Sequence, residues 1–318
     1  MWLKILLIIL AIVILLILIT SYYLSKKVLH PKRVCLEKSM HIENKAGRIN
    51  KDGYNKLIKE DLNIKSTNGY DLDTTIIYRE GINRENIIKY KEKVIIFVHG
   101  YEYNKIGSVK YFEIFRSRDF NIVMYDHRNS GNSGGNSTTM GYIEKHDLKT
   151  VINEVKSLFG QNAIIGLHGE SMGASTSLLT LEIEDNINFI IADCGYSNLK
   201  EELSYQIKKQ YKVPSFPFIN ISSIFNKLLV GYKYEDILPI ESIKKYGLKV
   251  PILFIHGDSD NFTPCKMSEE MYKARKESVD KNVCTMIYIG KNSDHTETYW
   301  NNKKECDAVI GRFLEEAL

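Results

Sequence analysis

The 318-residue sequence has few cysteines and few prolines, and the common metal-binding motifs are missing. Its five cysteines are scattered and odd in number, with no C-x-x-C pair, and no H-E-x-x-H motif occurs. A disulfide-stapled miniprotein and a zinc knuckle are therefore excluded. Unpaired thiols are expected, and they fit a reducing compartment slightly better than an oxidising one. A composition of 44% hydrophobic and 26% charged residues also excludes a disordered or collagen-like chain.

Charge is missing altogether from residues 5–24. Twenty helical residues span about 30 Å, which is the thickness of the hydrocarbon core of a bilayer. The sequence therefore predicts a single-pass transmembrane anchor over residues 1–24. A cleaved signal peptide is the alternative. The apolar run is longer than the usual hydrophobic region of such a peptide, however, and no small-x-small cleavage site follows it.

Positive charge is concentrated directly after this run. Residues 25–60 hold ten Lys and Arg against four Asp and Glu, which predicts a basic juxtamembrane linker, either solvated or attracted to anionic lipid head groups. Residues 61–318 carry a net charge of −3, so nucleic-acid binding loses its main electrostatic basis. The positive charges that flank the span favour a cytoplasmic location of the large domain. The short N-terminal segment of four residues favours the opposite orientation, and both orientations stay open.

From residue 61 onward, short β-branched runs alternate with helical patterns. This predicts an α/β domain, residues 61–318, with a mostly parallel sheet and helices on both faces. The expected strands are an opening hairpin and six apolar runs, at residues 62–65, 72–78, 94–98, 122–125, 163–167, 189–192, 252–255 and 284–289. Residues from about 197 to 248 lack a strand pattern, and a structureless loop of that length is improbable, so a helical lid is predicted there.

The segment Gly169-Glu170-Ser171-Met172-Gly173 directly follows one of these apolar runs and precedes a run that suits a helix. A nucleophile on a sharp strand-to-helix turn has a strained backbone, and a Cβ two residues before or after it would clash. The turn also places the serine at a helix N-terminus, which favours negative charge. An ordinary helix N-cap is the alternative, but a cap needs neither glycine. Ser171 is therefore the predicted nucleophile.

A serine hydroxyl needs a base to take its proton and an acid to orient that base. Turns after two later strands offer both, since one contains Asp258 and Asp260 and the other contains His295. Asp258 and Asp193 compete with Asp260 for the role of the acid, and the proline four residues after Asp260 favours Asp260. His295 competes with seven other histidines, but only His295 follows the acid at the expected place.

These motifs resemble the α/β-hydrolase superfamily from about residue 60 to residue 318. The resemblance rests on His99-Gly100, the loop Tyr125 to Gly131, the Gly169 to Gly173 elbow, the H-G-x-x-D-x-x-x-P turn from His256 to Pro264, and His295. It looks closest to membrane-anchored bacterial members of the serine aminopeptidase/esterase-like group. The chain departs from the pattern at Asn129 and at Asp294, where many relatives have glycine.

The resemblance implies roles for five residues. Ser171 would be the nucleophile, Asp260 the acid and His295 the base, and the backbone N–H groups of Tyr101 and Met172 would form the oxyanion hole. The expected function is that of a membrane-tethered serine hydrolase, which cleaves an ester or thioester of a small or lipid-like acyl substrate. A peptidase or amidase is the alternative, and so is a non-catalytic binding protein on the same scaffold. No metal or organic cofactor and no nucleic-acid partner is expected.

Overall fold

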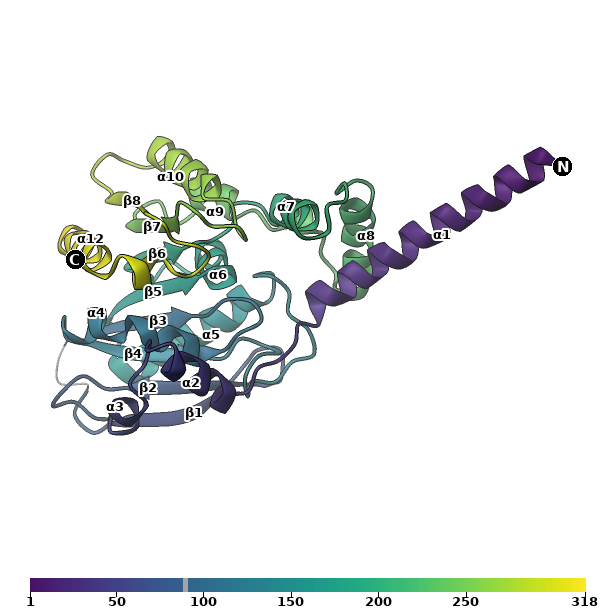
Figure 1. Cartoon of the computed structure of the whole chain (residues 1–318). Coiled ribbons are helices and arrows are strands. Elements are labelled where there is room, and N and C mark those ends of the chain that lie inside the picture. Colours follow the sequence, from purple (N-terminus) through teal and green to yellow (C-terminus); the bar gives the residue numbers. More distant parts are fainter. Residues whose placement is uncertain (88–90) are drawn as a thin grey trace.

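The computed structural model describes residues 1–87 and 91–318 of the chain. Within these residues, eight strands form one sheet (Figure 1): β1 (Lys59–Lys65), β2 (Asp71–Ile77), β3 (Lys93–Val98), β4 (Phe120–Tyr125), β5 (Ile164–Glu170), β6 (Phe189–Asp193), β7 (Ile252–Gly257) and β8 (Thr285–Gly290). The strand order is β1-β2-β4-β3-β5-β6-β7-β8. β2 pairs antiparallel with β1 and β4, and the other pairs are parallel. The α/β class and the mostly parallel sheet expected from the sequence are confirmed.

Helices cover both faces of the sheet because its central strands are apolar on both sides. Ile96 of β3 belongs to a buried cluster with residues of α5 (Glu144–Phe159), α6 (Met172–Thr180) and α10 (Lys266–Ser278). Its neighbour Phe97 belongs to the opposite cluster, with residues of α2 (Leu36–Lys45), α4 (Phe112–Arg116) and α12 (Lys303–Ala317). Shorter helical segments are α3 (Lys51–Asn55), the 3-10 helix η2 (Lys105–Tyr111) and α11 (Thr298–Asn301).

The N-terminal helix α1 (Trp2–Leu29) projects away from the domain (Figure 1). It continues five residues beyond the apolar run because nothing interrupts the helical backbone before Pro31, and residues preceding a proline disfavour the helical conformation. The stretch of residues 25–60, expected as a basic linker, is thus structured in large part. It holds the end of α1, both α2 and α3, and the start of β1. Met40 and Ile49 are buried against the sheet, so burial of apolar side chains orders this segment.

Helices also fill the chain between β6 and β7, where the sequence lacks a strand pattern. They are α7 (Leu199–Tyr211), α8 (Phe218–Val230), the 3-10 helix η3 (Tyr234–Asp236) and α9 (Pro239–Lys245). α7 and α8 lie beyond the carboxyl ends of the strands, and α8 lies beside α1 (Figure 1). The expected helical insertion is therefore present at about residues 197–248.

Candidate active site

Ser171 occupies the turn between β5 and α6. Its backbone has φ 55° and ψ −118°, which lies outside the regions that L-residues ordinarily adopt. A Cβ on Gly169 would lie 2.4 Å from the carbonyl oxygen of Gly173, and a Cβ on Gly173 would lie 1.8 Å from that of Val98. Both positions therefore require glycine, as the elbow motif predicts. The Ser171 N–H donates to the Asp193 carbonyl at 2.8 Å, which holds the strained turn against β6.

Three side chains from three strand-end turns form a hydrogen-bonded chain. The Nε2 atom of His295, in the turn after β8, lies 2.9 Å from the Ser171 hydroxyl oxygen. The Nδ1 atom of the same ring lies 2.7 Å from Oδ2 of Asp260, which follows β7. These distances allow Nδ1 to donate to the carboxylate while Nε2 accepts from the hydroxyl, which is the arrangement that makes a serine nucleophilic. The structure thus brings together Ser171, Asp260 and His295.

Asp260 is buried and fully hydrogen-bonded. Its Oδ1 accepts the backbone N–H groups of Phe262 and Thr263, both at 2.8 Å. Its Oδ2 lies 2.7 Å from His295 and also 3.1 Å from Nε2 of His256. Burial alone would raise the pKa of this carboxyl, but the hydrogen bonds from the two histidines hold the pKa below its ordinary value. Asp260 is therefore an anion at neutral pH.

The contact with Asp260 also changes the pKa of His295. Burial lowers its pKa, but the hydrogen bond and the negative charge of Asp260 more than offset this, so the pKa of His295 is raised above its ordinary value. Glu170 and Glu202 add to the effect at longer range. An imidazole with a raised pKa is a stronger base, and its protonated form is stabilised once it has taken a proton.

The competing acids lie elsewhere. Oδ1 of Asp258 accepts from the Ser259 hydroxyl at 2.8 Å. Asp193, at the end of β6, accepts from the Tyr111 hydroxyl at 3.1 Å, and burial raises its pKa to about 6. The carboxylate that contacts His295 is that of Asp260.

The buried histidines at two other strand ends are structural. His99 accepts the backbone N–H of His127 at 2.9 Å, and burial lowers the pKa of His99 to about 4. His168 packs against the rings of Phe97 and Tyr111, and burial lowers its pKa to about 4 as well. Both imidazoles are therefore neutral at pH 7, and His99 fixes the start of the loop after β4 through its hydrogen bond with His127.

The backbone beside the Ser171 hydroxyl offers hydrogen-bond donors. Met172 is the first residue of α6, and the N–H of a first helical residue has no partner inside its helix. A Cβ on Gly100 would lie 3.4 Å from the Ser171 Cβ and 3.9 Å from its Oγ, so the chain after β3 passes next to the hydroxyl. The Tyr101 N–H follows at that point. The assignment of the Tyr101 and Met172 N–H groups as oxyanion donors stays a prediction that this chain path allows.

A buried ion pair links the elbow to the loop that carries the base. Nζ of Lys110 lies 2.5 Å from Oε2 of Glu170, the residue before Ser171, and donates to the carbonyl of Thr296, the residue after His295, at 2.9 Å. Burial alone would raise the pKa of Glu170, but the charge of Lys110 and the hydrogen bonds from Lys110 and Tyr111 together lower it. This contact holds the turns of Ser171 and His295 in register.

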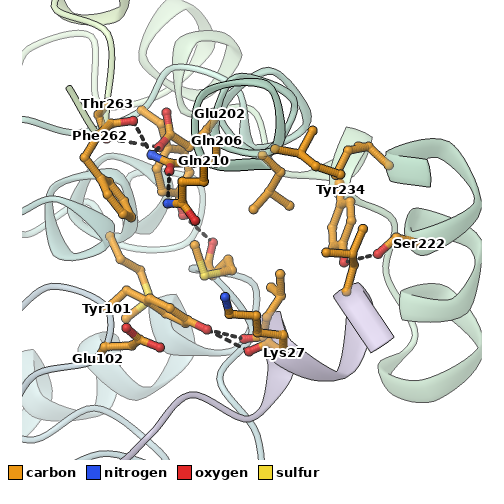
Figure 2. Close-up of a pocket in the computed structure, with 18 of the residues that line it drawn as sticks. Lys27, Tyr101, Glu102, Glu202, Gln206, Gln210, Ser222, Tyr234, Phe262 and Thr263 are labelled. Carbon is orange, nitrogen blue, oxygen red and sulfur yellow. Dashed lines mark hydrogen bonds between the residues drawn. The ribbon is translucent and has the colours of Figure 1, made fainter. Parts of the chain in front are cut away.

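Ser171 lines a cavity of about 170 Å³. Figure 2 shows this cavity. Its walls come from the lid helices, from the loop after β3, and from the C-terminal end of α1, which contributes Leu24, Lys27 and Val28. The Tyr101 hydroxyl donates to the carbonyls of Lys27 at 2.9 Å and Val28 at 3.2 Å, so the loop beside Ser171 is tied to α1. Because most of the lining side chains are apolar, the cavity suits an acyl group better than a polar one.

One buried carboxyl also lines this cavity. Glu202 of α7 is 3% exposed, and its Oε1 accepts from Gln206 at 3.1 Å and from Thr263 at 3.2 Å (Figure 2). Its Oε2 has no hydrogen-bond partner within the described residues. Burial raises the pKa of Glu202 to about 7, so the side chain carries a proton at mildly acidic pH.

Asn129 and Asp294 stand where many relatives have glycine, and neither residue disturbs the site. Asn129 adopts φ 58°, a left-handed conformation that asparagine tolerates better than most residues with a Cβ. Oδ1 of Asp294 accepts the backbone N–H groups of Asn261 at 2.9 Å and His295 at 2.8 Å. Asp294 thereby fixes the turn of the base to the turn of the acid.

Within residues 1–87 and 91–318, one group of side chains could hold a metal ion. It comprises Cys194, Asp260 and His295, whose ligand atoms lie within 4.8 Å of one another. Burial raises the pKa of the Cys194 thiol well above its ordinary value. Metals bind the thiolate, so this thiol is a poor ligand, and the two other side chains are already joined to each other.

Sequence motifs did not reveal several of these residues. The turn motif indicates no contact between its first residue, His256, and the acid, yet Nε2 of His256 lies 3.1 Å from the Asp260 carboxylate. The roles of Glu202 in the cavity, of Lys110 beside the elbow and of the end of α1 in the cavity wall have no sequence signature, since each depends on contacts between distant segments.

Residues 108–318 match the prolyl oligopeptidase family of peptidases. The chain belongs to this family. Among curated relatives, protein YqkD of Bacillus subtilis is 34% identical over 223 residues, which cover 70% of each chain. The lysophosphatidylserine lipase ABHD12 of Macaca fascicularis is 23% identical over 239 residues, which cover 72% of this chain and 58% of that protein.

Solved structures show the same fold. An esterase of Pyrococcus furiosus superposes with a TM-score of 0.69 at 21% identity, covering 92% of this chain and 98% of that one. The acylaminoacyl peptidase of Pyrococcus horikoshii gives a TM-score of 0.62 at 21% identity, covering 85% of this chain and 44% of that one. The fold is therefore that of the α/β-hydrolases, and the expected resemblance to this superfamily is confirmed.

Proposed function

We propose that the protein is a serine hydrolase that cleaves a carboxylic ester or thioester through Ser171, His295 and Asp260. The observation that carries the proposal is the hydrogen-bonded chain from the Ser171 hydroxyl through the His295 ring, at 2.9 and 2.7 Å, to a buried and ionised Asp260. The chain lies beside an apolar cavity and beside the start of α6, where the Met172 N–H has no partner inside its helix. The esterase and lipase among its structural and sequence neighbours support the same reaction class.

The reaction proceeds by acyl transfer. Ser171 Oγ attacks the carbonyl carbon while His295 Nε2 takes the hydroxyl proton, and the N–H groups of Met172 and Tyr101 stabilise the negative oxygen of the tetrahedral intermediate. The intermediate then expels the alcohol or thiol, which receives its proton from His295. Water, activated by the same ring, attacks the acyl-enzyme and releases the acid. Asp260 stabilises the imidazolium in both halves of the reaction.

Ester cleavage is favoured over amide cleavage by the cavity. A peptide substrate needs polar partners for the amide groups that flank the scissile bond, whereas the surface that this cavity presents is largely apolar. Membership of a peptidase family and the structural likeness to an acylaminoacyl peptidase favour a peptidase as the second candidate.

We also propose that α1 anchors the protein in a membrane as a single-pass span. Its mean hydropathy over 18 residues is 3.3, and none of that window is buried in the domain. A helix with this composition and exposure is stable in hydrocarbon and unfavourable in water. Sedimentation of the full-length protein with membranes after alkaline carbonate washing would support the anchor, and a processed form in the medium would instead indicate a signal peptide.

Substitution of the nucleophile tests the hydrolase directly. Ser171→Ala should retain the melting temperature of the native protein and lose hydrolysis of p-nitrophenyl acetate by about a thousandfold or more. Ser177→Ala, six residues further along the chain in α6, is the matched control. Retained hydrolysis in Ser171→Ala would rule out this serine as the nucleophile. A panel of esters and matched amides then separates the esterase from the peptidase.

A further inference from the structure

The end of the proposed anchor is part of the substrate cavity. One face of α1, with Ile17, Ser21, Leu24, Ser25 and Val28, is partly or fully buried, whereas the preceding residues of the helix are exposed. Leu24 and Val28 pack against the same buried cluster as Met172, the residue after the proposed nucleophile. The spacing of three and four residues puts these side chains on one side of the helix. The wall of the cavity is therefore continuous with the membrane span.

Packing along α1 also sets the height of the lid relative to a bilayer. If residues 5–24 fill the hydrocarbon core of about 30 Å, residues 17–24 occupy its last 12 Å or so. The ring of Tyr22 lies in this part of the helix and packs edge-on against Phe225 of α8, with ring centroids 5.4 Å apart. In Figure 1, α8 is the part of the domain that lies along α1 on the side from which the helix projects. α8 thus lies level with the membrane boundary.

The outward side of this lid segment is apolar. Ile224 and Leu228 of α8 are 52% and 76% exposed, and Phe216 in the preceding loop is 71% exposed. A patch of large apolar side chains beside a membrane span avoids water if it enters the lipid. α8 as a whole is an apolar helix of 13 residues with Lys227 as its one charged side chain.

The charge around this patch matches an anionic membrane surface. Residues 203–234 contain five lysines and no aspartate or glutamate, although the domain as a whole is mildly acidic. The lysines are Lys208, Lys209, Lys212, Lys227 and Lys233. Basic side chains that border an inserted apolar patch bind anionic head groups and keep their ammonium groups in the interface.

We propose that residues 211–230 of the lid insert their exposed apolar side chains into the leaflet at which α1 ends, and that the substrate is a membrane lipid. Its acyl ester passes along α1 from the leaflet to Ser171 without crossing water. The proposal rests on the proposed hydrolase activity and on the proposed anchor. It adds the class of substrate and the route by which that substrate enters.

Insertion of the lid is measured without catalysis. In the full-length protein with Trp2→Phe and Trp300→Phe, a single tryptophan is introduced by Leu228→Trp, and the protein is reconstituted in vesicles of phosphatidylcholine and phosphatidylglycerol. Brominated lipids should quench most of the fluorescence of this tryptophan. Tyr246→Trp, at an exposed residue that follows α9 away from α1, is the matched control and should not be quenched. A Leu228→Trp signal as insensitive as the control overturns the proposal.

Substrate delivery is measured as a ratio of two rates. Wild-type protein and Leu228→Glu hydrolyse a fluorogenic palmitoyl ester embedded in the same vesicles, and p-nitrophenyl acetate in solution. The substitution replaces an apolar side chain in the lipid by a charged one, so the ratio of the vesicle rate to the solution rate should fall about tenfold or more in the variant. Tyr246→Glu should leave the ratio as in wild type.

The outcomes separate the two proposals. Absence of hydrolysis of both esters by the wild-type protein contradicts the proposed hydrolase, and the quenching result then still decides whether the lid inserts. Hydrolysis of p-nitrophenyl acetate with an equal ratio in wild type and Leu228→Glu contradicts lipid delivery through the lid and leaves the hydrolase intact.

Discussion

The buried carboxyl of Glu202 leads to a specific prediction about stability and pH. Burial raises the pKa of this group from 4.5 to about 7 in the folded protein. The folded state therefore holds the proton of Glu202 more tightly than the unfolded chain does. The contribution of this proton to the free energy of unfolding is fully present below pH 4.5 and is lost as the pH rises through 7. Each pKa unit corresponds to about 1.4 kcal/mol, so the loss amounts to about 3 kcal/mol at pH 8.

Glu202→Gln removes this loss, because an amide cannot ionise and its oxygen still accepts from Gln206 and Thr263. The variant should match the native protein at pH 4.5 and exceed it by about 3 kcal/mol at pH 8, which is about 6–12 °C in melting temperature for a domain of this size. Melting is followed by circular dichroism for the full-length protein in a mild detergent. Glu201→Gln removes the same charge from the exposed neighbouring position and is the control. An equal difference at both pH values would refute the assignment of the raised pKa to Glu202.

Three further predictions concern the elbow, the acid and the packing of the lid. Gly173→Ala places a Cβ 1.8 Å from the Val98 carbonyl oxygen, so we expect loss of hydrolysis and a melting temperature lower by several degrees. Asp260→Asn removes the carboxylate that raises the pKa of His295, so the acid limb of the pH profile of kcat/KM should move to lower pH and the rate should fall by about ten-thousandfold. The buried Arg275 guanidinium donates at 2.6–2.8 Å to three backbone carbonyls in and after α9. Arg275→Leu should lower the melting temperature by about 10 °C, since each orphaned carbonyl costs about 1–3 kcal/mol.

The fold could be predicted from the sequence because the central strands are buried on both faces. Such strands are nearly continuous apolar runs, and Val94 to Val98 is one of them. The elbow could be predicted too, because its glycines are required locally. In the structure, a Cβ on Gly169 or Gly173 would clash with neighbouring backbone atoms. The proximity of Asp260 and His295 follows from the same rule, because the carboxyl ends of parallel strands meet at one edge of the sheet.

Long-range contacts without a local pattern could not be predicted in this way. The apolar run at residues 5–24 predicts a span, but nothing in it indicates that Leu24 lines the cavity beside Ser171. The stretch of residues 25–60 looks polar and basic, and its order depends on a few buried side chains such as Met40. The contact of His256 with Asp260 depends on the path of the chain after β7, and many unrelated proteins have a histidine at a strand end.

Covalent labelling of the nucleophile tests the central claim most directly. The full-length protein in detergent is treated with a fluorophosphonate, which reacts with serines activated by a neighbouring base, and the adduct is located by peptide mass mapping. We expect a single adduct on Ser171, lost in Ser171→Ala and retained in Ser177→Ala. The absence of an adduct from the folded wild-type protein, or its persistence in Ser171→Ala, would contradict the assignment of this protein as a serine hydrolase acting through Ser171.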